Sequence, residues 1–299
     1  MSGGMKRLYR GETTINFYGR RNLGFIASGL LVLITIVSLF AQGLNLGIDF
    51  KGGVAFEVPV QGSISIDVVE DVLKSEGLLD DGVKIQTLKS ETESRIRIQL
   101  GDQEPQKVTA IQTALAEKAN LTVNDVSVST VSSTWGRNIT MKAVNALLVF
   151  FLVVSIFISF RFEWRMAASA IAAMAHDVAI SVGLYSVLGL EVTPATVVAF
   201  LTILGFSLYD TIVVFDKVHD NTSRFSGSKV SYGDVVNVSM NQVLMRSLNT
   251  SLAAVLPVLS LLVLGSGVFG AVALREFALA LLVGLATGAY SSIYIATPL

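Results

Sequence analysis

The sequence has no cysteine, and its 299 residues include only five prolines, two histidines and 15% charged side chains. Without cysteine, disulfide bonds, thiolate metal sites and a cysteine nucleophile are excluded. The net charge of -1 offers no general attraction to nucleic acid. Hydrophobic residues make up 52% of the chain and the mean hydropathy is +0.63. Such a composition is typical of a membrane protein.

Apolar runs long enough to cross a bilayer as helices occur in six places. The first run lacks a cleavage pattern, so we expect an uncleaved membrane anchor. The last run repeats small residues every four positions (Gly284, Gly288 and Ser292), which lets helices approach closely. The predicted spans are residues 23–42, 141–160, 166–190, 193–215, 247–265 and 276–299, the last five forming a bundle over 141–299 with a connector at 216–246.

Lysine and arginine gather on one side of these spans. They precede the first span, separate the second from the third, and recur in the connector between the fourth and the fifth, whereas the short loops on the other side carry only Glu191 and Arg275. The positive-inside rule assigns the basic side to the cytoplasm. We therefore predict a cytoplasmic segment at residues 1–22, two cytoplasmic termini and an extracytoplasmic segment at residues 43–140.

Residues 43–140 have the patterns of a small folded domain. Strands with period-two alternation and helices with apolar residues three and four apart follow in the order strand, helix, strand, strand, helix, strand. That order predicts a ferredoxin-like α+β domain. It contains no metal-ligand spacing, no glycine-rich phosphate loop and no nucleophile–base set. We expect a binding or mechanical role, with no enzymatic activity and no cofactor.

Asp210 stands inside the fourth span, in the stretch "GFSLYDTIVVFD". A charged residue at the centre of a membrane helix costs about 2.5 to 3.5 kcal/mol on insertion scales and usually marks an ion or proton path. Burial favours the neutral carboxyl, whereas a nearby arginine favours the ionised form. Arg246, at the inner end of the fifth span, is expected to reach Asp210. The pair predicts a proton relay; the alternative is a static ion pair that holds helices together.

Other polar residues lie near this pair or in the third span. Ser207 precedes Asp210 by one turn, and Asn249 follows Arg246, so both are candidate supports for the relay. Asp177 is either a second relay station or a group that hydrogen-bonds packed helices. His176 either supports the relay or packs, and because adjacent helical residues point about 100° apart, the two should not face one site. An aspartyl protease is a further alternative, but its G-x-G-D motif is absent.

Just outside the first span, "GIDFKGG" has a local pattern of its own. In an extended segment Asp49 and Lys51 would share one face, and the glycines permit backbone conformations barred to other residues. The motif could transmit motion between the bundle and the outer domain, or it could be a tight turn. The candidate domain-coupling residues are Gly47, Asp49, Lys51, Gly52 and Gly53.

Five blocks resemble the signatures of the SecF subunits of the SecD/SecF protein-export family, which is related to the resistance-nodulation-division (RND) transporters. The blocks occur in family order along essentially the whole chain, so the resemblance is highly specific. They are "GIDFKGG" (47–53), "HDV" (176–178), "YDTIVVFDKVHDN" (209–221), "RSLNTSL" (246–252) and "GAYSSIYIATPL" (288–299).

The resemblance implies a six-span subunit of the bacterial cytoplasmic (inner) membrane that pairs with SecD. Such a complex draws preprotein outward through the SecYEG channel with the proton motive force, after the SecA ATPase has started transport, and YajC is a further partner. The resemblance assigns the proton path to Asp210 and Arg246. An RND-type small-molecule or lipid exporter is the alternative, although about 100 outer residues leave little room for a ligand. A passive scaffold is the third possibility.

Overall fold

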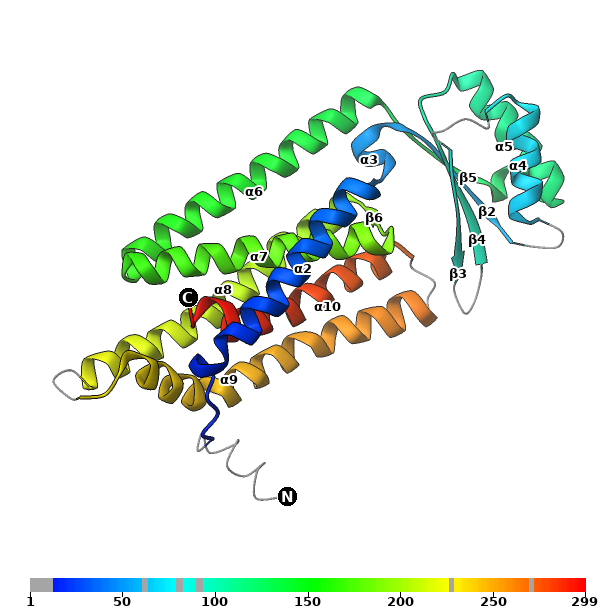
Figure 1. Cartoon of the computed structure of the whole chain (residues 1–299). Coiled ribbons are helices and arrows are strands. Elements are labelled where there is room, and N and C mark those ends of the chain that lie inside the picture. Colours follow the sequence, from blue (N-terminus) through cyan, green and yellow to red (C-terminus); the bar gives the residue numbers. More distant parts are fainter. Residues whose placement is uncertain (1–12, 61–63, 79–82, 90–93, 226–228, 269–271) are drawn as a thin grey trace.

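The computed structural model describes residues 13–60, 64–78, 83–89, 94–225, 229–268 and 272–299. The first part of the predicted cytoplasmic segment, residues 1–12, lies outside them. Within the described residues, six helices are long and apolar enough to span a membrane. These helices lie side by side in a bundle (Figure 1). The chain is therefore a multi-pass membrane protein, as predicted. The helices are α2 (Arg21–Ala41), α6 (Ser133–Arg161), α7 (Trp164–Leu188), α8 (Pro194–Arg224), α9 (Tyr232–Ser260) and α10 (Val272–Ser291).

Several helices continue past the apolar runs that predicted them. α6 begins at Ser133, where the Ser132 side chain accepts a hydrogen bond from the Trp135 N–H. Much of the predicted connector 216–246 is also helical, because α8 runs on to Arg224 and α9 begins at Tyr232. α6, α8 and α9 each begin after a serine or threonine that caps the helix, whereas the apolar run marks only the part that suits the bilayer.

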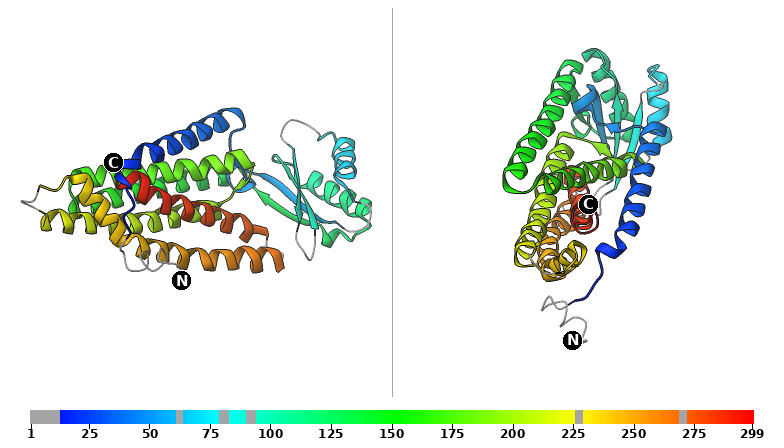
Figure 2. Two further views of the ribbon diagram at one scale, coloured as in Figure 1. Left: turned by 60° about the horizontal axis from the view of Figure 1, so that its bottom comes forward. Right: turned by 60° about the vertical axis from the view of Figure 1, so that its left-hand side comes forward.

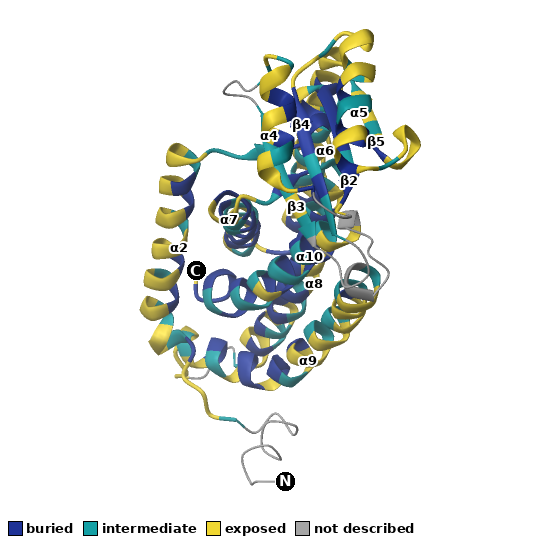
Figure 3. Ribbon diagram, turned by 90° about the vertical axis from the view of Figure 1, so that its right-hand side faces the viewer, coloured by how far each residue is buried: buried dark blue, intermediate teal, exposed yellow. Residues whose placement is uncertain are grey.

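Short side chains let the central helices pack closely. Buried residues concentrate in α7, α8 and α10, whereas much of α2 is exposed (Figure 3). At Gly284 on α10, an added Cβ would lie 2.1 Å from Ile203 Cδ1 on α8, and at Gly288 it would lie 2.9 Å from Ser207 Cβ. The small-residue stripe of the last span therefore faces α8.

We predict that Gly284→Ala lowers the thermal stability of the protein. The new methyl group must displace Ile203, and such overpacking typically costs about 1–3 kcal/mol. The control is Gly29→Ala on α2, where the same methyl group meets nothing within 4 Å. Thermal unfolding of both variants in detergent measures the difference. Equal melting temperatures would show that α10 moves aside without cost.

A four-stranded sheet with two helices on one face forms a separate layer at one end of the bundle (Figures 1 and 2). Its antiparallel order, β3-β4-β2-β5, is that of a ferredoxin-like fold and confirms the predicted fold class. We call this unit the sheet domain. Its elements are β2 (Gly53–Pro59), α4 (Ile66–Ser75), β3 (Lys84–Lys89), β4 (Ser94–Leu100), α5 (Pro105–Ala119) and β5 (Ser127–Val131).

The two faces of the sheet differ in polarity. In β4, Ile96 and Ile98 are buried in the apolar core shared with α4 and α5. Alternate residues of a strand point to opposite faces, so Arg97 and Gln99 lie on the face without helices. Lys84 of β3 pairs in register with Gln99 and shares that face. The uncovered face therefore carries charged and amide groups.

The "GIDFKGG" motif connects α2 to the sheet domain as a helical turn, not as the extended segment we expected. Ile48–Lys51 forms the one-turn helix α3, which still buries Ile48 and Phe50 and leaves Lys51 exposed. Gly52 and Gly53 have φ values of +80° and +128°, conformations that favour glycine. Gly47 has an ordinary φ of -68°.

Candidate functional site

Asp210 is buried between three helices and accepts two hydrogen bonds. Ser247 Oγ of α9 donates to Asp210 Oδ1 over 2.5 Å, and Ser292 Oγ, in the π-helical turn η4 (Ser292–Ala296) after α10, donates to Asp210 Oδ2. Asp210 is 6% exposed. The burial expected from its place in the span is therefore present, with two hydroxyls as its partners.

Asp177 of α7 forms a second centre and is fully buried. Ser207 Oγ of α8 and Ser291 Oγ of α10 both donate to Asp177 Oδ2, over 2.5 and 2.8 Å. His176 Nδ1 lies 3.1 Å from Asp177 Oδ1. The expectation that His176 and Asp177 could not share a site is wrong, because the carboxylate turns toward the neighbouring ring.

The two centres are connected through consecutive serines. Ser291 contacts Asp177 and Ser292 contacts Asp210, at the point where α10 passes into the wider π-helical turn. Ser207, which binds Asp177, stands one turn before Asp210 on α8. A hydroxyl group both donates and accepts hydrogen bonds, so these serines place proton-carrying groups beside both acids.

Two of the predicted supporting residues differ from the expected arrangement, and one partner of Asp210 was missed. Ser207 binds Asp177 and not Asp210. Asn249 is exposed on α9, and no hydrogen bond joins it to Asp210 among the described residues. Ser247, which does contact Asp210, follows Arg246 directly, so the missed partner was one position away from a predicted residue.

Arg246 is not among the hydrogen-bond partners that the structure gives Asp210 in this conformation. It is exposed and lines a pocket with Asp216 and Arg161, which pair with each other over 2.9 Å. Among the ion pairs of the described residues, none joins Arg246 to Asp210. The expected contact is therefore absent here, because Ser247 and not Arg246 lies on the face of α9 that meets Asp210.

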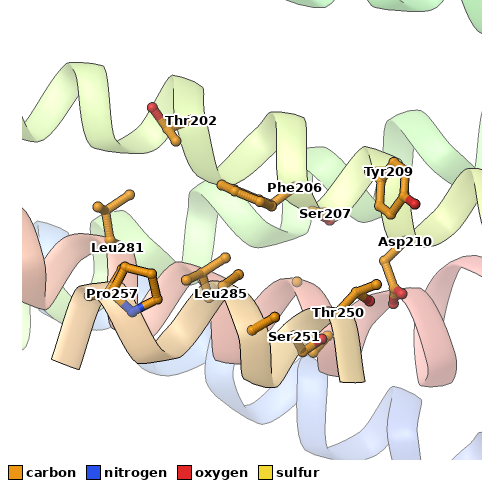
Figure 4. A pocket seen from close by; sticks show the side chains of 15 residues that line it. Thr202, Phe206, Ser207, Tyr209, Asp210, Thr250, Ser251, Pro257, Leu281 and Leu285 are labelled. Atoms are coloured by element: carbon orange, nitrogen blue, oxygen red, sulfur yellow. The ribbon is translucent and has the colours of Figure 1, made fainter. Parts of the chain in front are cut away.

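A cavity of about 570 Å³ reaches Asp210 from between α8, α9 and α10 (Figure 4). Asp210 lies at one end near Thr250, while Pro257 and Leu281 line the other end. The lining is mainly apolar with a few hydroxyls. The acid is therefore buried by packing but borders a space large enough for water.

The fold and the site define a class: a polytopic membrane protein that buries two hydroxyl-bound carboxyl groups in a helix bundle below a ferredoxin-like domain. Residues 110–299 match the family described as "Protein export membrane protein SecD/SecF, C-terminal", and residues 37–64 match "SecD/SecF GG Motif". The chain belongs to the SecD/SecF family of protein export membrane proteins.

Relatives extend over nearly the whole chain. It is 40% identical to "Protein translocase subunit SecF" of Streptomyces coelicolor, covering 98% of this chain and 78% of that one. It is also 40% identical to the Mycobacterium leprae protein of the same name, of which it spans 66%. The crystal structure of SecDF, a translocon-associated membrane protein from Thermus thermophilus, aligns with a TM-score of 0.85 and 34% identity over 96% of this chain and 38% of that chain.

Proposed function

We propose that this chain is the SecF-like half of a SecD–SecF complex that uses the proton motive force to promote late steps of protein translocation through SecYEG. The observation that carries the proposal is Asp210, a buried carboxyl group between three helices that borders a cavity. The role is transport and not catalysis. We propose a location in the bacterial inner membrane; by the positive-inside rule, the basic loops support cytoplasmic termini and a sheet domain on the outer side.

In this mechanism Asp210 binds a proton while only neutral hydroxyls surround it, and one of them turns to accept a hydrogen bond from the protonated carboxyl group. Asp210 releases the proton when Arg246 approaches. Arg246 and Ser247 point about 100° apart on α9. A rotation of α9 by that angle exchanges the Ser247 hydroxyl for a guanidinium, which favours the ionised carboxylate. Moving one charge through the membrane potential supplies about 2.3 kcal/mol per 100 mV.

SecD is the expected partner. The Thermus thermophilus and Bacillus subtilis relatives named SecDF match this chain over 38% and 37% of their length, so they carry additional chain beside the matched part. The size of this chain fits one half of a two-part assembly. We also propose that the complex interacts with the SecYEG channel, with preprotein, with membrane lipid and with YajC, and that it interacts indirectly with SecA.

The test of this proposal is export of a secretory protein into inverted membrane vesicles, with and without a proton gradient. Vesicles with the parent chain should respond to the gradient, whereas those with Asp210→Asn should not. A gradient response that is equal in both would overturn the proposed function.

Asp177 is proposed as a second proton-binding group. We expect Asp177→Asn to fold, because the amide oxygen still accepts from Ser207 and Ser291, and to lower the gradient response about fivefold, near the lower end of ordinary coupling between sites. The measurement is the same export assay, normalised to the amount of complex. An unchanged response would make Asp177 a packing group.

A further inference from the structure

A buried ion pair joins the sheet domain to the helix bundle. Glu191, between α7 and α8, is 1% exposed, and its Oε1 lies 3.3 Å from Arg97 Nη2 on β4. Arg97 stands on the face of the sheet that α4 and α5 leave uncovered. The two residues are far apart in sequence and belong to different layers of the structure.

Glu191 depends on Arg97 for compensation of its charge. Within the part of the chain that the structure describes, neither carboxylate oxygen accepts a hydrogen bond. Gly47 provides the space: a Cβ there would lie 2.5 Å from Glu191 Oε1. A buried charge that loses its ion-pair partner is strongly destabilising, so the position of Arg97 matters to the α7–α8 connection.

Neighbouring contacts bring the end of α2 into the same junction. Asn45 and Leu46 form strand β1, which pairs in parallel with β6 (Glu191–Val192). Lys84 Nζ of the sheet domain donates to Asn45 Oδ1. Burial lowers the pKa of Lys84, the ammonium of Lys51 lowers it further, and the Glu191 carboxylate raises it. Glu191 is therefore close enough to act on a second cation of the sheet domain.

The junction connects directly to the helices that carry both acids. α7 carries Asp177 and ends just before Glu191, and α8 begins at Pro194 just after it. Asp210 lies 16 residues into α8, which corresponds to about 24 Å along the helix. A rigid helix transmits a displacement of its end over that distance.

We propose that the Arg97–Glu191 ion pair is the positioning contact that couples the sheet domain to α7 and α8. When the sheet domain moves away, Glu191 loses its partner and the α7–α8 connection must rearrange to rehydrate the carboxylate. The coupling of this movement to export rests on the proposed function, whereas the positioning of the domain does not.

The test uses the absence of cysteine, which permits clean spin labelling. Labels at Lys118 on α5 and Leu188 on α7, both exposed, report the distance between the layers in lipid bilayers without a proton gradient. We expect a narrow distribution in the parent and a broad one in Glu191→Gln. The doubly neutral variant Arg97→Gln/Glu191→Gln leaves no unpaired buried charge at position 191, and Glu57, which also lies 3.8 Å from Arg97 Nε, is about one third exposed. It should therefore fold as well as the parent yet show the broad distribution.

Export measures the functional consequence. In Glu191→Gln and in the doubly neutral variant, the stimulation of export by the proton gradient should fall about fivefold, near the lower end of ordinary coupling between sites. The control is Arg224→Gln/Asp220→Asn, which removes an exposed ion pair of α8 and should change neither readout. A parental distance distribution in the doubly neutral variant would overturn the proposal. A broad distance distribution with an unchanged gradient response would show that the ion pair only positions the sheet domain. That result would overturn the proposed coupling to export.

Discussion

Replacement of Asp210 by Asn should abolish the stimulation of protein export by a proton gradient while export without the gradient remains. The amide keeps the size of the side chain; its oxygen can accept from one of Ser247 and Ser292, and its NH2 group can donate to the hydroxyl of the other, so the helices should pack as before. It cannot take up and release a proton at physiological pH. The loss corresponds to the driving energy of one charge, about 2.3 kcal/mol per 100 mV.

The measurement is export of a secretory protein into inverted vesicles that contain the variant, corrected for the amount of assembled complex. Asp220→Asn makes the same chemical change on the same helix at a residue that is about half exposed, and it should respond to the gradient like the parent. If Asp210→Asn retained the parental response, protons would take another route and the relay would be refuted.

Replacement of Arg246 by Ala should give the same loss of gradient response as Asp210→Asn. The guanidinium is exposed in this conformation, so its removal costs little stability in the folded state shown here. In the proposed state in which α9 has rotated, the Arg246→Ala protein lacks the cation that favours the ionised form of Asp210. The export assay, with and without the gradient, measures the effect.

A comparison with the neighbouring serine sharpens this prediction. Ser247→Ala removes a hydrogen bond to a buried carboxyl group, which is worth about 1.5–3 kcal/mol when the group is charged. It should weaken the gradient response without abolishing it, because Ser292 still donates to Asp210. An Arg246→Ala protein that is scarce but fully responsive would assign Arg246 a structural role and exclude it from the relay.

Much of the architecture followed from local patterns. Apolar length identified the six spans, and the two periodicities within residues 43–140 identified the ferredoxin-like order of strands and helices. These patterns succeed because bilayer thickness and backbone hydrogen bonding act on each segment separately. The sequence blocks shared with the family, such as "GIDFKGG", identified the family to which the chain belongs.

The partners of the acids did not follow from local patterns. Ser292 was interpreted as part of a packing stripe, and that stripe does face α8. The Ser292 hydroxyl, however, also donates a hydrogen bond to Asp210. Arg246 and Ser247 differ by one position, and the rotation of α9 in the bundle decides which of them meets the carboxyl group. A sequence contains the residues of a helix face but not the angle at which the neighbouring helix meets that face.

The sequence by itself therefore determined the class of protein, the number of membrane spans, the fold of the sheet domain and the presence of acids inside the membrane. Only the tertiary structure decided which hydroxyls bind Asp210 and Asp177, that Ser247 and not Arg246 contacts Asp210, and that Arg97 pairs with Glu191. The reason is physical: hydrophobicity and periodicity are properties of one segment, whereas a buried hydrogen bond or ion pair depends on the relative placement of several.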